Sequence, residues 1–77
     1  MKEKKIRVVA YAGYRSEELP RQFYIDDEQI DVSTVIHSWT VEDKESGKRQ
    51  RFFKVRGSDG YMHTILYDES SQEWFLS

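Results

Sequence analysis

Apolar and polar residues alternate along much of this chain, which is the pattern of β-strands that bury one face. The alternation is clearest in the run RFFKVRG. There Phe53 and Val55 take one face, and Phe52, Lys54 and Arg56 take the other. We therefore predict a strand that places the first pair in the core and the other three outside.

A hairpin turn is predicted directly after this strand, at the segment GSDG that ends with Gly60. The Asp-Gly pair favours backbone with positive φ, because glycine has no Cβ and aspartate tolerates the left-handed region. The run that follows, YMHTILY, is again rich in residues typical of strands. We expect Gly60 to adopt a positive φ.

The length of the hairpin loop decides which side of the second strand is buried. A loop of two or four residues would place Thr64 and Leu66 on the face of Phe53, whereas a three-residue loop would place Ile65 and Tyr67 there. Both registers are compatible with the sequence. We favour the three-residue loop, because Ile65 and Tyr67 are the larger and more strand-prone pair.

The remaining alternating runs predict further strands. They are Ile6–Tyr11, Arg21–Ile25, Gln29–Val32 followed directly by Ser33–Val41, and Gln72–Leu76. Polar segments, among them Arg15–Pro20 and Glu42–Lys48, separate them as loops or turns. Five or six short strands joined by tight turns predict one all-β domain over residues 1–77. We expect an antiparallel meander curled into a partly open barrel, SH3-like or similar.

The segment Ser33–Val41 also fits a second pattern. Val32, Val35, Ile36 and Trp39 have the spacing of one helix face. We favour a strand, because Val, Ile, Thr and Trp dominate the segment and strong helix formers are missing from it.

Composition limits how the core can be built. The chain has 77 residues, eleven of them aromatic, and no cysteine, so neither a disulfide nor a thiolate is available. A domain of this size buries only about 60% of the surface that its unfolded chain exposes. We therefore expect the two largest apolar side chains, Trp39 and Trp74, to lie in the core.

Charge and hydropathy indicate the compartment. The net charge is −2, with 14 acidic and 12 basic side chains, a balance that neither requires nor excludes a nucleic-acid partner. No apolar run approaches the roughly 20 residues of a membrane helix or forms the core of a signal peptide. The prediction is a cytoplasmic chain without a membrane partner.

Motifs for catalysis or metal binding are missing from the sequence. His37 and His63 are far apart, and the acidic run from Asp26 to Asp31 lacks the glycine and the distal glutamate of a calcium loop. The sequence also lacks a nucleophile elbow, a zinc-protease motif and a phosphate-binding glycine loop. We predict a protein that is not an enzyme, without metal or cofactor.

Basic and aromatic residues interleave on the central strand. Phe52, Lys54 and Arg56 share its outer face, and Arg49 and Arg51 lie beside them. Such a face can stack bases and hold phosphates. One hypothesis is therefore weak binding of single-stranded nucleic acid through these five residues, although a solvated outer face explains the same pattern.

A protein partner is the other hypothesis for this binding module. The last strand, with Trp74, Phe75 and Leu76, either completes the core or leaves an open edge for another chain. The partner is thus an unknown macromolecule, protein or single-stranded nucleic acid. The chain itself is expected to be a monomer or a weak homo-oligomer.

Several motifs together point to a family. They are YAGYR from Tyr11 to Arg15, E-x-P-R-x-F from Glu18 to Phe23, Val35 followed by Trp39, FKVRGSDG from Phe53 to Gly60, Leu66-x-Asp68 and Trp74-x-Leu76. With them the chain resembles a family of small bacterial proteins without an assigned activity. A looser similarity runs to a β-rich domain of unknown function that is sometimes linked to lesion-bypass polymerase-like proteins. The resemblance implies a small cytoplasmic domain and supplies no catalytic residues.

Overall fold

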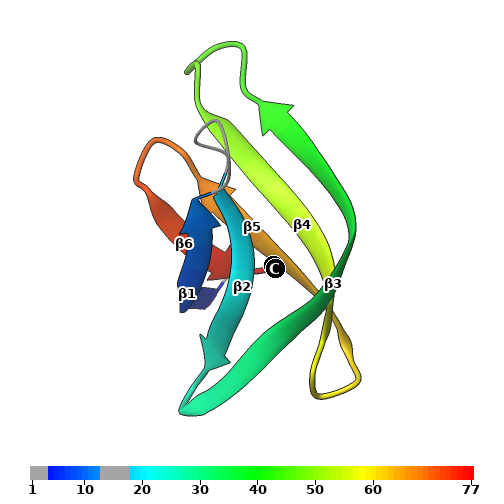
Figure 1. Cartoon of the computed structure of the whole chain (residues 1–77). Coiled ribbons are helices and arrows are strands. Elements are labelled where there is room, and N and C mark those ends of the chain that lie inside the picture. Colours follow the sequence, from blue (N-terminus) through cyan, green and yellow to red (C-terminus); the bar gives the residue numbers. More distant parts are fainter. Residues whose placement is uncertain (1–3, 13–17) are drawn as a thin grey trace.

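The computed structural model describes residues 4–12 and 18–77, and within them it contains six strands and no helix (Figure 1). The strands are β1 (Lys4–Ala12), β2 (Glu18–Ile25), β3 (Glu28–Glu42), β4 (Arg49–Gly57), β5 (Met62–Asp68) and β6 (Glu73–Leu76). Each strand pairs antiparallel with the next, and β6 pairs with β1. The predicted small antiparallel barrel is confirmed, and its strand order is closed.

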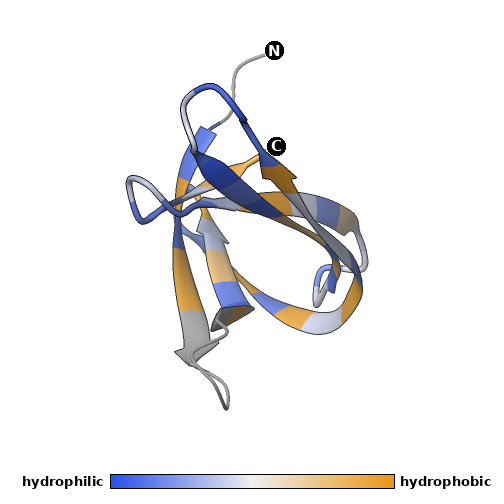
Figure 2. Cartoon of the chain, turned by 90° about the horizontal axis from the view of Figure 1, so that it is seen from above, coloured by the Kyte–Doolittle hydropathy of each residue, from blue (hydrophilic) through white to orange (hydrophobic). Residues whose placement is uncertain are grey.

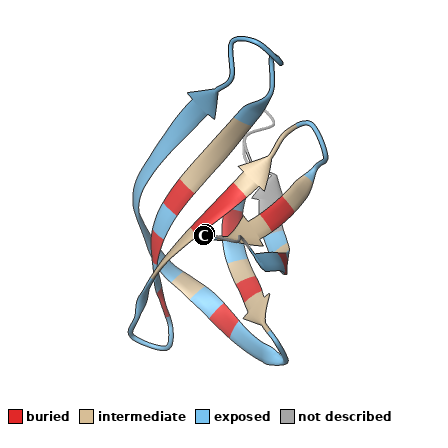
Figure 3. Ribbon diagram, turned by 180° about the vertical axis from the view of Figure 1, so that it is seen from behind, coloured by how far each residue is buried: buried red, intermediate tan, exposed pale blue. Residues whose placement is uncertain are grey.

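All six strands contribute to one apolar core inside the barrel. Its buried members are Ile6, Phe23, Ile30, Phe53, Val55, Ile65 and Trp74. From Phe53 to Gly57 in β4, buried and exposed positions alternate (Figure 3), with Phe53 and Val55 inside as the sequence predicted. Seen from above, the strands form a ring in which hydrophobic segments alternate with hydrophilic ones (Figure 2).

The hairpin between β4 and β5 has the three-residue loop. Phe53 lies opposite Ile65, and the backbone N–H of Gly57 donates a hydrogen bond to the carbonyl of Tyr61, with an N–O distance of 2.9 Å. Gly60 has a φ of 87°. The favoured register and the positive φ are both confirmed.

Strand β2 begins earlier than the sequence indicated. The segment Arg15–Pro20 was expected to be a loop, but β2 starts at Glu18 and includes Pro20; residues 15–17 lie outside the described part of the chain. The pairing of β2 with β1 skips Arg21, so Pro20 lies beside a β-bulge. Bulges and edges are the places where a strand tolerates a residue without an N–H.

Strand β3 is one long strand of 15 residues, which confirms the strand prediction for Ser33–Val41. Its pairing with β4 skips two residues, Ser33 and Ile36. Each bulge adds a residue on one side of the ladder and shifts the alternation that follows. After the second bulge, His37 and Trp39 lie opposite Lys54 and Phe52, the outward positions of β4.

The two tryptophans therefore have different environments. Trp74 is 8% exposed and belongs to the core, as predicted. Trp39 is 38% exposed, so the prediction that it lies in the core is wrong. Val35 lies opposite the core residue Val55, and the extra residue Ile36 after it moves Trp39 to the outer face, opposite Phe52.

Candidate binding surface

The five residues predicted to bind a partner do not share one face. Phe52, Lys54 and Arg56 occupy alternate positions of β4 that point away from the core, and the two cations are exposed. Arg49 and Arg51 occupy the other set of positions, in step with the core residues of the same strand. The structure thus keeps three of the five residues together.

The two remaining arginines have neighbours of their own. The guanidinium carbon of Arg51 lies 5.5 Å from the ring centroid of Phe53, and Arg49 is opposite Glu42 in the ladder. Arg51 also borders a hollow of about 190 Å³ that Trp39 helps to line. Both arginines therefore belong to the hairpin tip and its inner side rather than to the outer face.

An apolar row crosses the outer face over four strands. Trp39, Phe52, Leu66 and Phe75 lie opposite one another on β3, β4, β5 and β6. The rings of Trp39 and Phe52 stack, with 5.2 Å between centroids and 5° between planes. Leu66 is fully buried although it is outside the barrel core. We call these four residues the outer row.

His37 extends the outer row along β3. Its ring stacks on Trp39, with 5.5 Å between centroids and 25° between planes. Sequence reasoning missed both residues as members of a surface. Counted from Val35, which lies opposite the core residue Val55, strict alternation would place both on the core side. The extra residue Ile36 moves them to the outer face.

One edge of β3 is open. The strand pairs with β2 only through Glu28–Asp31, and from Ser33 to Glu42 its ladder with β4 is the only pairing among the described residues. In Figure 1 this half of β3 diverges from β2 and runs with β4 to the end of the hairpin. Figure 3 shows it exposed throughout. We call the side of Ser33–Glu42 away from β4 the open edge.

The last strand, by contrast, is not an edge. β6 pairs with β5 through its whole length and with β1 through Lys4–Ile6. The hypothesis of an open edge at Trp74–Leu76 is therefore wrong, and these residues close the barrel.

A shallow hollow of about 280 Å³ lies where β2 and β3 diverge. Its lining is Leu19, Pro20, Arg21, Val32, Ser33, Thr34 and Val35. Leu19 and Val35 are 44% and 37% exposed. The open edge therefore begins beside an apolar depression.

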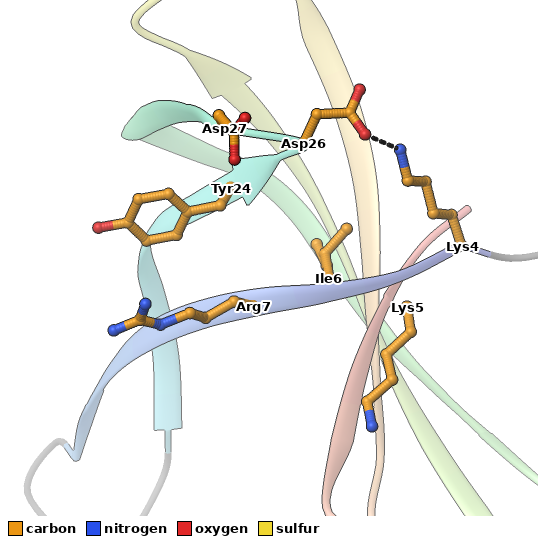
Figure 4. Close-up of a pocket in the computed structure, with 7 residues that line it drawn as sticks. All are labelled: Lys4, Lys5, Ile6, Arg7, Tyr24, Asp26 and Asp27. Atoms are coloured by element: carbon orange, nitrogen blue, oxygen red, sulfur yellow. Dashed lines mark hydrogen bonds and ion pairs between the residues drawn. The ribbon is translucent and has the colours of Figure 1, made fainter.

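A larger hollow, of about 530 Å³, lies over β1 and the turn between β2 and β3 (Figure 4). Most of its charged groups are already engaged. Lys4 Nζ lies 2.6 Å from Asp26 Oδ1, and the Arg7 guanidinium carbon is 5.2 Å from the centroid of the Tyr24 ring. Both cationic and anionic side chains line this hollow, so it favours neither anionic nor cationic ligands.

A histidine–carboxylate pair closes the β4–β5 loop. His63 Nε2 lies 2.9 Å from Asp59 Oδ2, and the Asp59 carboxylate accepts the backbone N–H of Tyr61 at 3.0 Å. The Tyr61 hydrogen bond, followed by that from His63, holds the pKa of Asp59 below its ordinary value. The His63 ring packs edge-on against the core ring of Phe23, so the pair joins the loop to the core.

Two further observations concern metals and membranes. Within the described ranges, no three His, Cys, Asp or Glu side chains gather as a metal site would require. No helix in the same part of the chain is long and apolar enough to cross a membrane.

Comparison with known proteins gives no relative from which a function could be transferred. No protein-family model, no curated protein and no solved structure matches this chain.

Proposed function

We propose that this protein is a non-enzymatic interaction module that binds an extended segment of a partner protein by adding it as a strand to β3. The observation that carries the proposal is the open edge. Unpaired N–H and C=O groups along a strand form a template for another strand. On Ser33–Glu42 this template is long and is covered by no other described strand.

The side chains of this part of β3 support the proposal. Val35, Ile36, Trp39 and Val41 are 37–46% exposed, and Ser33–Val41 contains no acidic, lysine or arginine residue. Proteins usually protect an exposed edge with charges, proline or a bulge. Here only the two bulges interrupt it, and pairing with β4 is regular from His37 to Glu42. We expect a partner strand to pair along that regular part.

The hollow at the start of the open edge would give such a segment some specificity. Main-chain hydrogen bonds provide affinity in strand addition, and pockets for side chains provide selectivity. An apolar side chain of the bound segment would pack against Leu19 and Val35. The lack of cysteine fits a cytoplasmic setting for this module.

The test uses peptides selected on the intact protein from a random peptide library. We expect selected peptides to shift the backbone amide resonances of His37–Glu42. A lysine on the edge should block pairing, so Val41→Lys should weaken binding at least about tenfold. Val9→Lys is the matched control, because Val9 and Val41 are the same residue type and are 41% and 46% exposed.

Three outcomes would contradict the proposal. One is a selection that enriches no peptide. Another is equal weakening by both lysine variants, which would move the site away from β3. The third is concentration-dependent self-association that shifts the same His37–Glu42 amides and is lost in Val41→Lys. That result would make a second copy the occupant of the open edge.

A further inference from the structure

The outer face of the sheet is divided by charge. Lys54 is flanked across the ladders by His37 and Thr64, and neither of its neighbours carries a negative charge. Arg56, two residues along β4, lies between Thr34 and Met62. These two cations form no ion pair with any residue that the structure describes.

The acidic side chains of this face lie on the other side of the outer row. Asp68 and Glu73 are opposite each other on β5 and β6. Glu73 is engaged by Lys5. The outer row thus separates an acidic end of the face from a basic end made of Lys54 and Arg56.

Exposed aromatic rings border the basic end. Trp39 is the more exposed of the two tryptophans, and it stacks on both His37 and Phe52. Phe52 is partly covered by Trp39 on one side and lies against buried Leu66 on the next strand. A planar ligand would therefore reach Trp39 and His37 more readily than Phe52.

We propose that this face binds single-stranded nucleic acid, with phosphates at Lys54 and Arg56 and a base against Trp39 and His37. Free cations beside stacked aromatic rings match the alternation of phosphates and planar bases in a single strand. Charge complementarity and aromatic exposure carry the assignment, which uses the outward side chains of β3 and β4 and not the unpaired backbone of the open edge. In it Phe52 is a positioning residue that supports the Trp39 ring.

The test is a titration of the full chain with oligo-dT and, separately, oligo-U at low salt, followed by backbone amide resonances. We expect shifts centred on His37–Trp39 and Phe52–Arg56 with at least one of the two oligonucleotides. The two titrations decide between DNA and RNA as the ligand.

Charge variants test the phosphate contacts. The double variant Lys54→Gln/Arg56→Gln should weaken binding and flatten the dependence of log K on log salt by about 0.7 per lost contact. Lys44→Gln/Lys48→Gln is the matched control, since it removes the same charge from exposed residues of the β3–β4 turn. Equal weakening by both pairs would indicate attraction to the overall charge and overturn the site.

A variant of Trp39 tests the base contact. Trp39→Ala should weaken binding about five- to 150-fold, the range measured for loss of base stacking. Trp39→Phe should retain most of the affinity, and its thermal unfolding shows whether the fold is intact. Absence of amide shifts with both oligonucleotides would overturn the proposal. So would binding of polyglutamate as tight as that of the oligonucleotides and insensitive to Trp39→Ala.

Discussion

Ile65 and Leu66 are consecutive residues of β5 that point to opposite faces of the sheet, and both are fully buried. Ile65 belongs to the barrel core. Leu66 lies outside it, between Phe52 and Phe75 of the neighbouring strands. This small domain therefore buries apolar surface on both sides of β5. In a domain this small the barrel core buries little surface, so it supplies only part of the stability that the fold needs. The second apolar layer adds to it.

The first prediction tests that outer layer. Leu66→Ala should lower the free energy of unfolding by about 2–5 kcal/mol, as expected for a fully buried leucine. Urea denaturation measures the change. Thr64→Ala, on the same face of β5 but only partly buried, is the control. A loss no greater than that of the control would show that the outer layer contributes little.

The second prediction concerns the two tryptophans. Trp74→Ala should cost about 3–5 kcal/mol, because it removes a large buried side chain from the core. Trp39→Ala should cost clearly less, because Trp39 is 38% exposed. Quenching by acrylamide gives a second measurement: the fluorescence of the Trp74→Ala protein, which retains Trp39, should be quenched more strongly than that of Trp39→Ala. The reverse order would place Trp39 in the core.

The third prediction separates two glycines of one hairpin. A Cβ at Gly57 would lie 2.5 Å from Asp59 Oδ1 and 2.7 Å from Ile30 Cγ2, so Gly57→Ala forces a side chain to move. Gly60 has open space around it but a φ of 87°, so Gly60→Ala strains the backbone by about 1–2 kcal/mol. Thermal unfolding should show both variants to be destabilised. Wild-type stability of Gly57→Ala would mean that the loop adjusts freely.

The fourth prediction is a dependence on pH. The hydrogen bond from Tyr61, with that from His63, lowers the pKa of Asp59 below 3.8 in the folded state. A carboxyl with a lowered folded pKa stabilises the protein above its unfolded pKa, and this stabilisation is lost as the pH falls through the folded value. The free energy of unfolding should therefore decrease below about pH 4.

Asp59→Asn tests this link, because the variant removes the titrating group. Its unfolding free energy, measured in urea between pH 6 and pH 2, should fall less steeply than that of the wild type. Some decrease should remain, since Asp43, Asp68 and Glu73 also have lowered pKa values through hydrogen bonds in their turns and to Lys5. Identical pH profiles for variant and wild type would contradict the role of Asp59.

The β4–β5 hairpin could be predicted from the sequence because its determinants are local. The alternation around Phe53 sets the buried face, and the geometry around Gly60 sets the turn. The face of Trp39 could not be predicted in this way. Two extra residues, Ser33 and Ile36, each reverse the alternation, and nothing in their residue types marks them as bulges.

The candidate surfaces show the same division between local and long-range determinants. The shared face of Phe52, Lys54 and Arg56 follows from strand periodicity, and the structure keeps them together. The open edge depends on how far β2 accompanies β3, which is decided by pairing between strands and not within one. Alternation along β3 carries no information about that length.

Closure of the barrel also sets when the chain can finish folding. Ile6 on β1 pairs with Trp74 on β6, so the ladder that seals the core joins the first and last strands. During synthesis β1 emerges from the ribosome before β6 has been made, and until then Ile6 on β1 lacks its partner Trp74. The final step of folding is therefore expected after synthesis of Trp74. The fluorescence of Trp74, which changes when its side chain is buried, would report the pairing of β6 with β1.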